Sequence, residues 1–426
     1  MNSLLRIPYA LAGQLAHALA RVTPAGESKV RRGLSARRGI VERYERWSST
    51  SRDPARPLAW FHAPSVGEGL QAQPVIELLR TRSPDVQIAY TFYSPSAEQF
   101  ARSLKADFVD YLPFDTFAVA DRIIAALRPS ALVFGKLDIW PALTERAAAA
   151  GVHVGVISGT LAETSGRRGF FARAVLSDAY RAIDRLGAID AIDAGHFREL
   201  GVRPDKVHVT GDTRYDQVWT RAQRAPSALV QSMRSSRPTL VAGSTWPSDE
   251  ALLFNVWSRM RDKIPDARLV IAPHELTAPR LASVERWARG RDLRSTRIDA
   301  RDAPDADVVL VDRFGILGDL YAIADVAYVG GGFRSAGLHS VLEPAAFGAP
   351  VLFGPRNDKS RDAAKLIEAG GGAVVTGEAE LSMRLGEWLG SLPARDSAGT
   401  AARSMVEGGV GAAERSYELV SALLDR

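Results

Sequence analysis

The sequence predicts an α/β protein built from two units, each a parallel sheet with helices on both faces. Three observations support this. The chain has 426 residues, more than one ordinary hydrophobic core accommodates. Short runs rich in Val, Ile and Leu alternate with helical segments, as expected for parallel strands buried on both faces. The alternation is interrupted between Asp216 and Arg237 by polar, helix-favouring residues, which indicates a domain boundary.

Twelve segments have the composition of buried strands. Those in the first half are Leu58–Ala63, Val86–Thr91, Asp107–Leu112, Ala131–Phe134, Val152–Ile157, Arg185–Ala188 and Val207–Val209. Those in the second half are Thr239–Ala242, Leu269–Ala272, Val308–Val311, Val326–Val329 and Pro350–Phe353. We expect a first doubly wound domain over residues 57–222 and a second over 223–426, with the active site in the cleft between them. The final helix, Ala412–Leu424, is expected to pack back across that cleft.

Composition excludes several classes of protein. Hydrophobic content of 46% and charged content of 24% are those of a soluble globular chain. Without cysteine there is no disulfide, thiolate metal site or cysteine nucleophile, which fits a reducing compartment. The first 56 residues hold eleven Lys and Arg against four Asp and Glu, and the remainder holds 43 against 45. Because the body is nearly neutral, we expect no nucleic-acid partner.

Residues 1–56 are expected to form a basic, amphipathic membrane-association arm. Polar residues interrupt its apolar start, which falls short of the roughly 20 apolar residues needed to cross a bilayer. The residues that an interfacial helix would press into lipid are Leu4, Leu5, Tyr9, Leu11, Leu15 and Leu19. The pairs Arg31–Arg32 and Arg37–Arg38 follow, as is typical of helices on anionic membranes. A solvated basic arm and a secretory signal are the alternatives, and the polar interruptions disfavour the signal.

The stretch from Ala327 to Pro355 reads as strand, glycine turn, short helix and strand. Glycines such as Gly331 let a ligand approach the backbone, and free N–H groups at a helix start favour phosphate. The carboxylate of Glu343 suits the paired hydroxyls of a ribose, because it only accepts hydrogen bonds. The alternative is that Glu343 complements the helix dipole and that the glycines serve packing alone.

Three polar segments follow strands of the first half, where open α/β sheets bind ligands. Glu68 lies between two glycines and is a candidate general base, although Ser65 to Glu68 also has capping-box spacing. Asp138 lies in Lys-Leu-Asp-Ile-Trp-Pro, which alternatively reads as a surface Lys–Asp pair. Arg214 offers a cation in a segment that alone would pass for a turn.

In the second half, Ser244 follows a strand and offers a hydroxyl and N–H groups to phosphate, and Pro273–His274 follows the next strand. A lone His is more often structural than catalytic. No HExxH or similar cluster supports a catalytic metal. The GxGxxG fingerprint, the Walker A lysine and the GxSxG elbow are also missing.

Together these stretches resemble the 3-deoxy-D-manno-octulosonic acid (Kdo) transferases of lipopolysaccharide synthesis, a GT-B glycosyltransferase family. The resemblance runs from about Trp60 to Val375, with the basic arm in the place of the family's membrane anchor. The matching pieces arrive in family order: SVGE, KLDIWP, TGDTRYD, AGST, APHE and AYVGGGF…LHSVLEPAAFGAPVLFGP. Each is weak alone, but six in order are specific.

The resemblance implies a GT-B fold and an inverting transfer of Kdo from CMP-Kdo to a lipid A precursor, without a metal or other cofactor. It implies that Glu68 is the general base and that Asp138 and Arg214 stabilise the transition state. The residues it implies for binding CMP are Pro273, His274, Gly315, Ile316, Leu317, Ser340, Val341, Leu342 and Glu343. It further implies a peripheral or monotopic place on the cytoplasmic face of the bacterial inner membrane.

Three positions depart from the family pattern, and they bear on which acceptor is used and how many Kdo residues are added. Lys136 stands where the family often has an acid, Ser340 where Asn is common, and His274 at the second position of a Pro-Arg-His form. Two alternative functions stay open: a related GT-B transferase or epimerase using a UDP-sugar, and a non-catalytic nucleotide-binding scaffold at the membrane.

Overall fold

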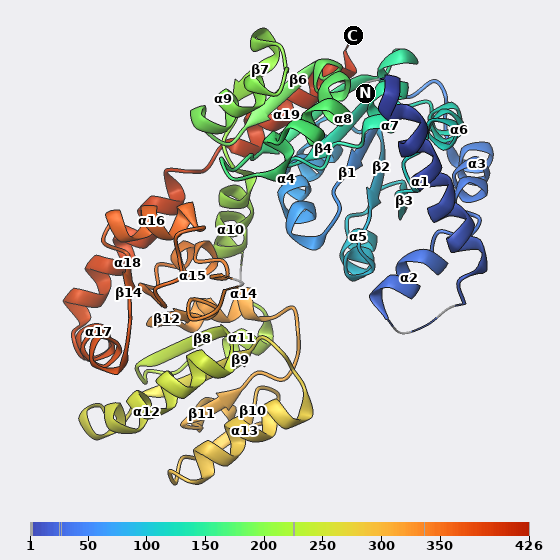
Figure 1. The fold of residues 1–426 in the computed structure, drawn as a ribbon. Coiled ribbons are helices and arrows are strands. Elements are labelled where there is room, and N and C mark those ends of the chain that lie inside the picture. Colours follow the sequence, from blue (N-terminus) through green and yellow to red (C-terminus); the bar gives the residue numbers. More distant parts are fainter. Residues whose placement is uncertain (1–2, 25, 27, 225, 336, 426) are drawn as a thin grey trace. The chain divides into compact units, whose positions relative to one another are not determined.

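The computed structural model describes residues 3–24, 26, 28–224, 226–335 and 337–425. It divides into two compact units (Figure 1): unit 1, Met1–Gln217 with Gly411–Arg426, and unit 2, Val218–Val410. The division differs from the expected ranges at both ends of the second domain. The chain leaves unit 1 before residue 222, and the last helix returns to unit 1. The expected cleft between the domains stays a prediction.

Unit 1 holds a seven-stranded, all-parallel sheet. Its strands are β1 (Leu58–His62), β2 (Gln87–Phe92), β3 (Phe108–Tyr111), β4 (Ala131–Gly135), β5 (His153–Gly159), β6 (Arg185–Ala188) and β7 (Val207–Val209). They run in the order β3-β2-β1-β4-β5-β6-β7. Successive strands are therefore added on one side of β1 up to β3 and on its other side from β4 onward. The point between β1 and β4 where this order reverses is where doubly wound sheets bind ligands.

Helices cover both faces of this sheet and bury its apolar strands. The helices of unit 1 are α1 (Ser3–Val22), α2 (Lys29–Ser35), α3 (Ile40–Ser51), α4 (Val66–Arg82), α5 (Glu98–Ser103), α6 (Phe117–Leu127), α7 (Pro141–Ala149), α8 (Phe170–Arg181), α9 (Ala191–Glu199), α10 (Thr213–Gln223, which continues into unit 2) and α19 (Ala412–Leu424). Leu419, Val420 and Leu423 of α19 join the core of unit 1. Figure 1 shows α19, in red, among these earlier elements.

Unit 2 repeats this architecture. Its strands are β8 (Thr239–Thr245), β9 (Arg268–Pro273), β10 (Ser295–Arg297), β11 (Val308–Leu310), β12 (Val326–Val329), β13 (Val351–Phe353) and β14 (Gly372–Val374), in the order β10-β11-β9-β8-β12-β13-β14. Its other helices are α11 (Ala228–Ser232), α12 (Pro247–Lys263), α13 (Ala278–Arg289), α14 (Leu317–Leu320), α15 (Leu342–Ala346), α16 (Arg361–Glu368), α17 (Glu378–Gly390) and α18 (Leu392–Glu407). The reversal here lies between β8 and β12.

The expected α/β architecture is confirmed, and all twelve predicted strands are present. Strands β10 and β14, which form the two edges of the second sheet, were not predicted. Neither carries the buried apolar run that marks the central strands, since β10 is the polar Ser-Thr-Arg and β14 is Gly-Ala-Val. Edge strands are less buried than central ones, so their sequences need no continuous apolar run by which a strand could be predicted.

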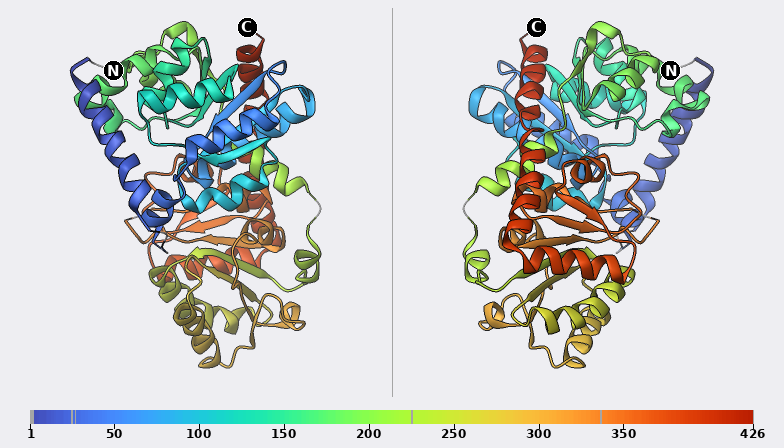
Figure 2. Two further views of the ribbon diagram at one scale, coloured as in Figure 1. Left: turned by 90° about the vertical axis from the view of Figure 1, so that its right-hand side faces the viewer. Right: turned by 90° about the vertical axis from the view of Figure 1, so that its left-hand side faces the viewer.

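The predicted arm is built into unit 1. Its last helix, α3, buries Ile40, Val41 and Tyr44 in the core. Helix α1 lies along the outside of unit 1 in both views of Figure 2. Its residue Tyr9 was wrongly expected to face lipid, because its hydroxyl donates to the buried Asp115 at 2.7 Å. The side chain of Leu4 lies outside the described residues.

Arg37 was likewise expected to belong to a surface basic cluster and is instead buried. Its guanidinium donates to the carbonyl oxygens of Leu112 at 2.8 Å, Gly33 at 2.7 Å and Tyr93 at 3.0 Å. It also lies over the Tyr93 ring, 4.1 Å from the centroid. Arg37 therefore ties the arm to the loops that follow β2 and β3.

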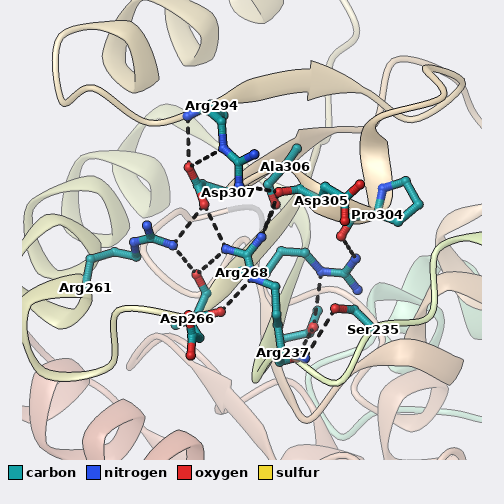
Figure 3. Close-up of polar contacts among 12 residues, drawn as sticks. Ser235, Arg237, Arg261, Asp266, Arg268, Arg294, Pro304, Asp305, Ala306 and Asp307 are labelled. Atoms are coloured by element: carbon teal, nitrogen blue, oxygen red, sulfur yellow. Dashed lines mark hydrogen bonds and ion pairs between the residues drawn. The ribbon is translucent and has the colours of Figure 1, made fainter.

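A charged cluster fastens the amino ends of the strands in unit 2 (Figure 3). Asp307 accepts hydrogen bonds from Arg237 at 2.8 Å and Arg261 at 3.1 Å. Burial opposes its ionisation, but these arginines outweigh burial and the pKa of Asp307 lies below its usual value. The fully buried Arg268 donates to the carbonyl of Met233 at 2.8 Å, and burial lowers its pKa to about 10.

Candidate active site

Glu68 and Asp138 lie at the reversal point of unit 1. Glu68 is in the first turn of α4, which follows β1, and Asp138 is in the loop that follows β4. Strands β1 and β4 are neighbours and parallel, so both loops leave the same edge of the sheet. Topology therefore brings together two residues that are 70 positions apart in the chain.

The carboxylate of Glu68 contacts Lys136 and Ser65. Lys136 Nζ lies 3.5 Å from Oε1, and the Ser65 hydroxyl donates to Oε2. The Ser65 side chain caps no backbone N–H of the helix, so the capping-box alternative is wrong. The side chain of Glu68 is 20% exposed, which leaves it open to a ligand at the sheet edge.

Gly69, next to Glu68, is needed for close packing. A Cβ at this position would lie 2.4 Å from the Phe100 ring and 2.7 Å from the Tyr90 hydroxyl. Such distances require the neighbouring rings to move. The glycine thus lets the first turn of α4 approach β2 and α5, which fixes where the Glu68 side chain begins.

Asp138 is held by a histidine, a tryptophan and an arginine. His62 Nε2 lies 3.2 Å from Oδ2, and Trp140 Nε1 donates to the same oxygen at 3.0 Å. Arg167, in the loop after β5, lies 3.4 Å from Oδ1. Burial disfavours the charged form, but these partners outweigh it and hold the pKa of Asp138 below its usual range. Asp138 is therefore a fixed negative charge at neutral pH, not the lone surface partner of Lys136.

The orientation of His62 is set by its other ring nitrogen. The Thr91 hydroxyl accepts from Trp60 Nε1 at 2.9 Å and lies 3.0 Å from His62 Nδ1. When Nδ1 accepts the hydroxyl proton, Nε2 carries the ring N–H and donates it to Asp138 Oδ2. The ring is then locked with Nε2 toward Asp138.

Arg214 lies in the first turn of α10 and pairs with Asp212. Its Nε and Nη2 atoms donate to Asp212 Oδ2 at 2.9 and 2.6 Å. Burial raises the pKa of Asp212, but Arg214 outweighs burial and the net shift is downward. Gln71, one turn beyond Glu68 in α4, donates to Asp212 Oδ1 at 3.2 Å. Arg214 is thus anchored to the helix that carries Glu68, and its side chain is 38% exposed.

In unit 2, Asp249 joins the two loops at the reversal point. Its Oδ2 accepts the N–H of Trp246 at 2.9 Å and the N–H of Gly331 at 3.0 Å. Its Oδ1 accepts the Tyr328 hydroxyl at 3.0 Å. The N–H of Gly331 is therefore already used inside the protein. Asp249 was not singled out from the sequence, where it reads only as a helix-start acid.

The three consecutive glycines pack against backbone. A Cβ on Gly330 would lie 2.3 Å from the carbonyl oxygen of Ser244, and one on Gly332 would lie 2.5 Å from the nitrogen of Gly354. Gly331 has φ of +96°, which side chains rarely adopt. The packing alternative therefore accounts for these glycines, whose role is to bring the loops after β8, β12 and β13 together.

Aromatic rings stack at the same edge. His274, which directly follows β9, stacks on Trp246 with centroids 4.4 Å apart and on His339 at 4.6 Å. The Arg334 guanidinium lies 3.6 Å from the centroid of the Trp246 ring. Burial and the neighbouring His274 lower the pKa of His339 to about 4, so its ring is neutral at neutral pH. The stack offers ring faces and a cation to a nucleotide.

Glu343 lies in the first turn of α15 and pairs with Arg221 of α10. Arg221 Nη1 donates to Oε1 at 3.1 Å, and Asp319 lies on the other side of Arg221, 3.6 Å away. Burial raises the pKa of Glu343, although Arg221 opposes this. Oε2 makes no hydrogen bond to the part of the chain that the structure describes, and it is free to accept from a ligand hydroxyl. No sequence signal linked Arg221 to this site.

The remaining candidates of unit 2 surround this carboxylate in the chain. Ser340 is exposed, whereas the side chains of Val341 and Leu342 are buried, so these two offer only backbone groups. No N–H of residues 340–343 donates to another described residue. Gly315, with φ of +89°, and Ile316 lead into α14, where Leu317 packs against Gly243.

Three of the six described non-glycine residues with positive φ lie at the carboxyl ends of strands. Lys136 after β4, Ser158 in β5 and Ser244 in β8 all have left-handed φ values of 63°, 51° and 53°. For residues with a Cβ this costs roughly 1–3 kcal/mol each and is often found at functional sites. At Lys136 the strained conformation accompanies the contact with Glu68.

Two features are absent from the described residues. No group of three or more His, Asp or Glu side chains is placed to hold a metal ion. No helix in the described ranges is long and apolar enough to cross a membrane. Metal independence stays a prediction.

Two doubly wound parallel sheets, each with polar residues at its reversal point, have the architecture of the GT-B fold. The comparisons with known proteins agree. Residues 34–217 match the family model "3-Deoxy-D-manno-octulosonic-acid transferase (kdotransferase)". The chain is therefore similar to the Kdo transferases, and these matches support a glycosyltransferase activity.

Curated relatives extend the match over most of the chain. The chain is 26% identical to the Haemophilus influenzae 3-deoxy-D-manno-octulosonic acid transferase, covering 92% of both chains. It is 28% identical to the Bordetella pertussis protein of the same name, covering 86% of this chain and 88% of that one. Among solved structures, UDP-GlcNAc 2-epimerase from Neisseria meningitidis superposes with a TM-score of 0.63 at 14% identity, over 87% of this chain and 99% of that one. This last likeness concerns the fold alone.

Proposed function

We propose that this protein transfers Kdo from CMP-Kdo to a hydroxyl of a lipid A precursor, with inversion and without a metal. The observation that carries the proposal is the place of Glu68, beside Lys136 and at the same sheet edge as Asp138, at the reversal point of unit 1. A carboxylate there accepts the proton of the attacking hydroxyl as the new bond forms. Ser65 and Lys136 orient it.

The charged residues around Glu68 suit the rest of the reaction. As the bond from CMP to Kdo breaks, positive charge grows on the sugar and negative charge on the leaving phosphate. The fixed negative charge of Asp138 favours the first, and the exposed guanidinium of Arg214 favours the second. Each side chain is already held in place by its own partners, so little reorganisation is needed during transfer.

Unit 2 supplies the features expected of a nucleotide site. The free oxygen of Glu343 suits a ribose hydroxyl, and the N–H groups of residues 340–343 suit a phosphate. Ser244, Pro273, His274 and the 315–317 loop complete the proposed CMP contacts. Gly331 is proposed only as a shaping residue, because its N–H is bonded to Asp249.

The donor is tested by thermal stability. A ligand that binds the folded state increases the free energy of unfolding, by about 2.7 kcal/mol at a ligand concentration of 100 Kd, and thereby raises Tm. We expect CMP and CMP-Kdo to raise Tm, and UDP-GlcNAc to leave it unchanged. A shift with UDP-GlcNAc alone would favour the UDP-sugar alternative. Binding of CMP without any transfer would favour the non-catalytic scaffold.

We further propose that α1 holds the protein peripherally on the cytoplasmic face of the inner membrane. Ile7, Leu11, Leu15 and Val22 are between 60% and 76% exposed. Spaced by four or seven residues, they form one stripe on the helix. Phe170 and Phe171, at the start of α8, are also exposed and follow Arg167 and Arg168. Exposed apolar side chains beside basic ones are typical of membrane-surface segments.

The stripe can be tested without touching the fold. We expect the double variant Leu11→Glu, Leu15→Glu to lose most of its binding to anionic vesicles, because two charges then replace apolar area that would enter the lipid. The matched control, Ile192→Glu with Val209→Glu, changes two exposed apolar residues of unit 1 on other elements. Equal vesicle binding by the α1 variant and this control, measured by co-sedimentation, would contradict the placement.

A further inference from the structure

Unit 1 contains a cavity of about 470 Å³ between α1, α3 and α6, and neither the proposed reaction nor the apolar stripe uses it. From α1 it is lined by Gln14, His17, Ala18 and Arg21. Glu42 of α3, Arg122 of α6, Thr116 and the buried Arg37 complete its polar lining. A volume of this size is typical of small-ligand sites.

The charge of this cavity is positive and incompletely neutralised. Arg37 is 3% exposed, and its guanidinium hydrogen-bonds to carbonyl oxygens and forms no ion pair with the described residues. The nearby carboxylate of Asp110 is paired with Arg43 at 2.6 Å. Arg21 forms no ion pair with the described residues. Arg122 is paired, with Glu45 at 2.8 Å and Glu42 at 3.8 Å. A buried cation without an ion-pair partner of its own beside an open cavity favours an anion there.

The pKa of His17, which lines the cavity, is affected by the same positive charges. His17 Nε2 lies 3.3 Å from the carbonyl of Phe114. Burial lowers the pKa of His17, and the charges of Arg21 and Arg37 lower it further. The ring is therefore a neutral group in a positive environment, with room beside it.

The cavity adjoins the apolar stripe of α1. Successive residues of a helix are rotated by about 100°, which places Gln14, Ala18 and Arg21 next to Leu11, Leu15 and Val22 around the axis. A molecule with an anionic head in the cavity and an apolar tail would lay that tail along the stripe. A free inorganic anion would occupy only the cavity and would make no contact with the apolar stripe.

We propose that this cavity binds the phosphate headgroup of an anionic membrane phospholipid, with its acyl chains lying on the exposed face of α1. The proposal rests on the membrane association proposed above and makes it specific. It assigns Arg21 and Arg37 to the phosphate and the α1 stripe to the chains. The lipid is then held at one defined place, in contrast to a diffuse attraction between basic residues and the membrane.

The test compares Arg21→Gln with Arg31→Gln in the full-length protein. Arg31 is an exposed arginine of α2 that does not line the cavity. A basic residue near an anionic surface contributes about 1 kcal/mol, or about a fivefold change. We expect Arg31→Gln to weaken partitioning to phosphatidylglycerol vesicles by no more than about this, and Arg21→Gln by about tenfold or more, as a direct charge-assisted contact would. Equal losses in the two variants would overturn the proposal.

A soluble probe separates the headgroup from free phosphate. We expect glycerol phosphate to shift the ring resonances of His17 in the wild type, observed by NMR, and to shift them less in Arg21→Gln. No shift in the wild type would overturn the proposal. If inorganic phosphate shifts His17 while Arg21→Gln binds vesicles like the wild type, the site takes free phosphate and the lipid assignment is wrong. Neither experiment uses CMP-Kdo, so each outcome is independent of the proposed transfer reaction.

Discussion

Glu68→Gln is expected to abolish Kdo transfer while the protein stays folded. A positioned general base contributes about 10²- to 10⁴-fold to a rate, and the amide cannot accept the proton of the acceptor hydroxyl. Gln keeps the size of the side chain and an oxygen that accepts from Ser65. We therefore expect kcat to fall by about this factor, with KM for CMP-Kdo nearly unchanged, because the donor contacts lie in unit 2.

The matched control is Glu77→Gln, which makes the same chemical change at an exposed position of the same helix. Rates are measured from Kdo incorporation into a lipid A precursor, and folding from thermal unfolding. Wild-type turnover by Glu68→Gln would contradict its role as the base. A large loss in the Glu77 control would show that α4, and not the carboxylate of Glu68, is sensitive to substitution.

Asp138→Asn is expected to have the second largest effect. The substitution removes the charge while keeping the shape, and loss of one group that stabilises transition-state charge costs about 10²- to 10³-fold in kcat. A neutral amide also holds Arg167 and His62 less firmly. The measurement is kcat for Kdo transfer, with Asp121→Asn as control, since Asp121 forms an exposed ion pair with Arg146. Equal rates for wild type and Asp138→Asn would refute the assignment.

Asp138 is also expected to make the stability of the folded protein depend on pH. The folded-state pKa of Asp138 is lowered, so its ionised form stabilises unit 1 above its unfolded pKa. This contribution is lost as the pH falls through the folded pKa. The Tm of Asp138→Asn should therefore approach that of the wild type at acidic pH and lie below it at neutral pH. A constant difference across this range would show that the charge does not contribute.

Most of the fold was predictable because central parallel strands need continuous apolar runs. Strands such as Val326–Val329 and Ala131–Phe134 could be placed from composition alone. The returning helix α19 could be recognised as a helix, but not assigned to unit 1. Its apolar residues fit any core, and only packing against β5 and β6 decides which. The same holds for the arm, where Arg37 and Tyr9 read as surface residues until their carbonyl and carboxylate partners are known.

The candidate site was predictable where residues directly follow strands. Glu68, Asp138 and His274 could be singled out because the carboxyl ends of parallel strands meet at one edge. The residues that hold them could not. Arg221 pairs with Glu343 across more than a hundred positions, and Arg167 reaches Asp138 from another loop. Nothing in local sequence marks such long-range pairs.

The glycine cluster shows how one pattern serves either of two purposes. Close approach to a ligand and close approach to backbone both require the missing Cβ, so Gly330 and Gly332 fit both readings in sequence. Distances to Ser244 and Gly354 decide for backbone. The glycines then act on the site indirectly, by setting where the loops after β8 and β12 begin.

The most direct test of the proposed function is to incubate the purified protein with CMP-Kdo and a lipid A precursor and to measure the mass of the lipid. We expect the lipid mass to increase by one or more Kdo residues, with release of CMP, and no increase for Glu68→Gln. An unchanged lipid mass with wild-type protein that binds CMP-Kdo would contradict the proposed transfer.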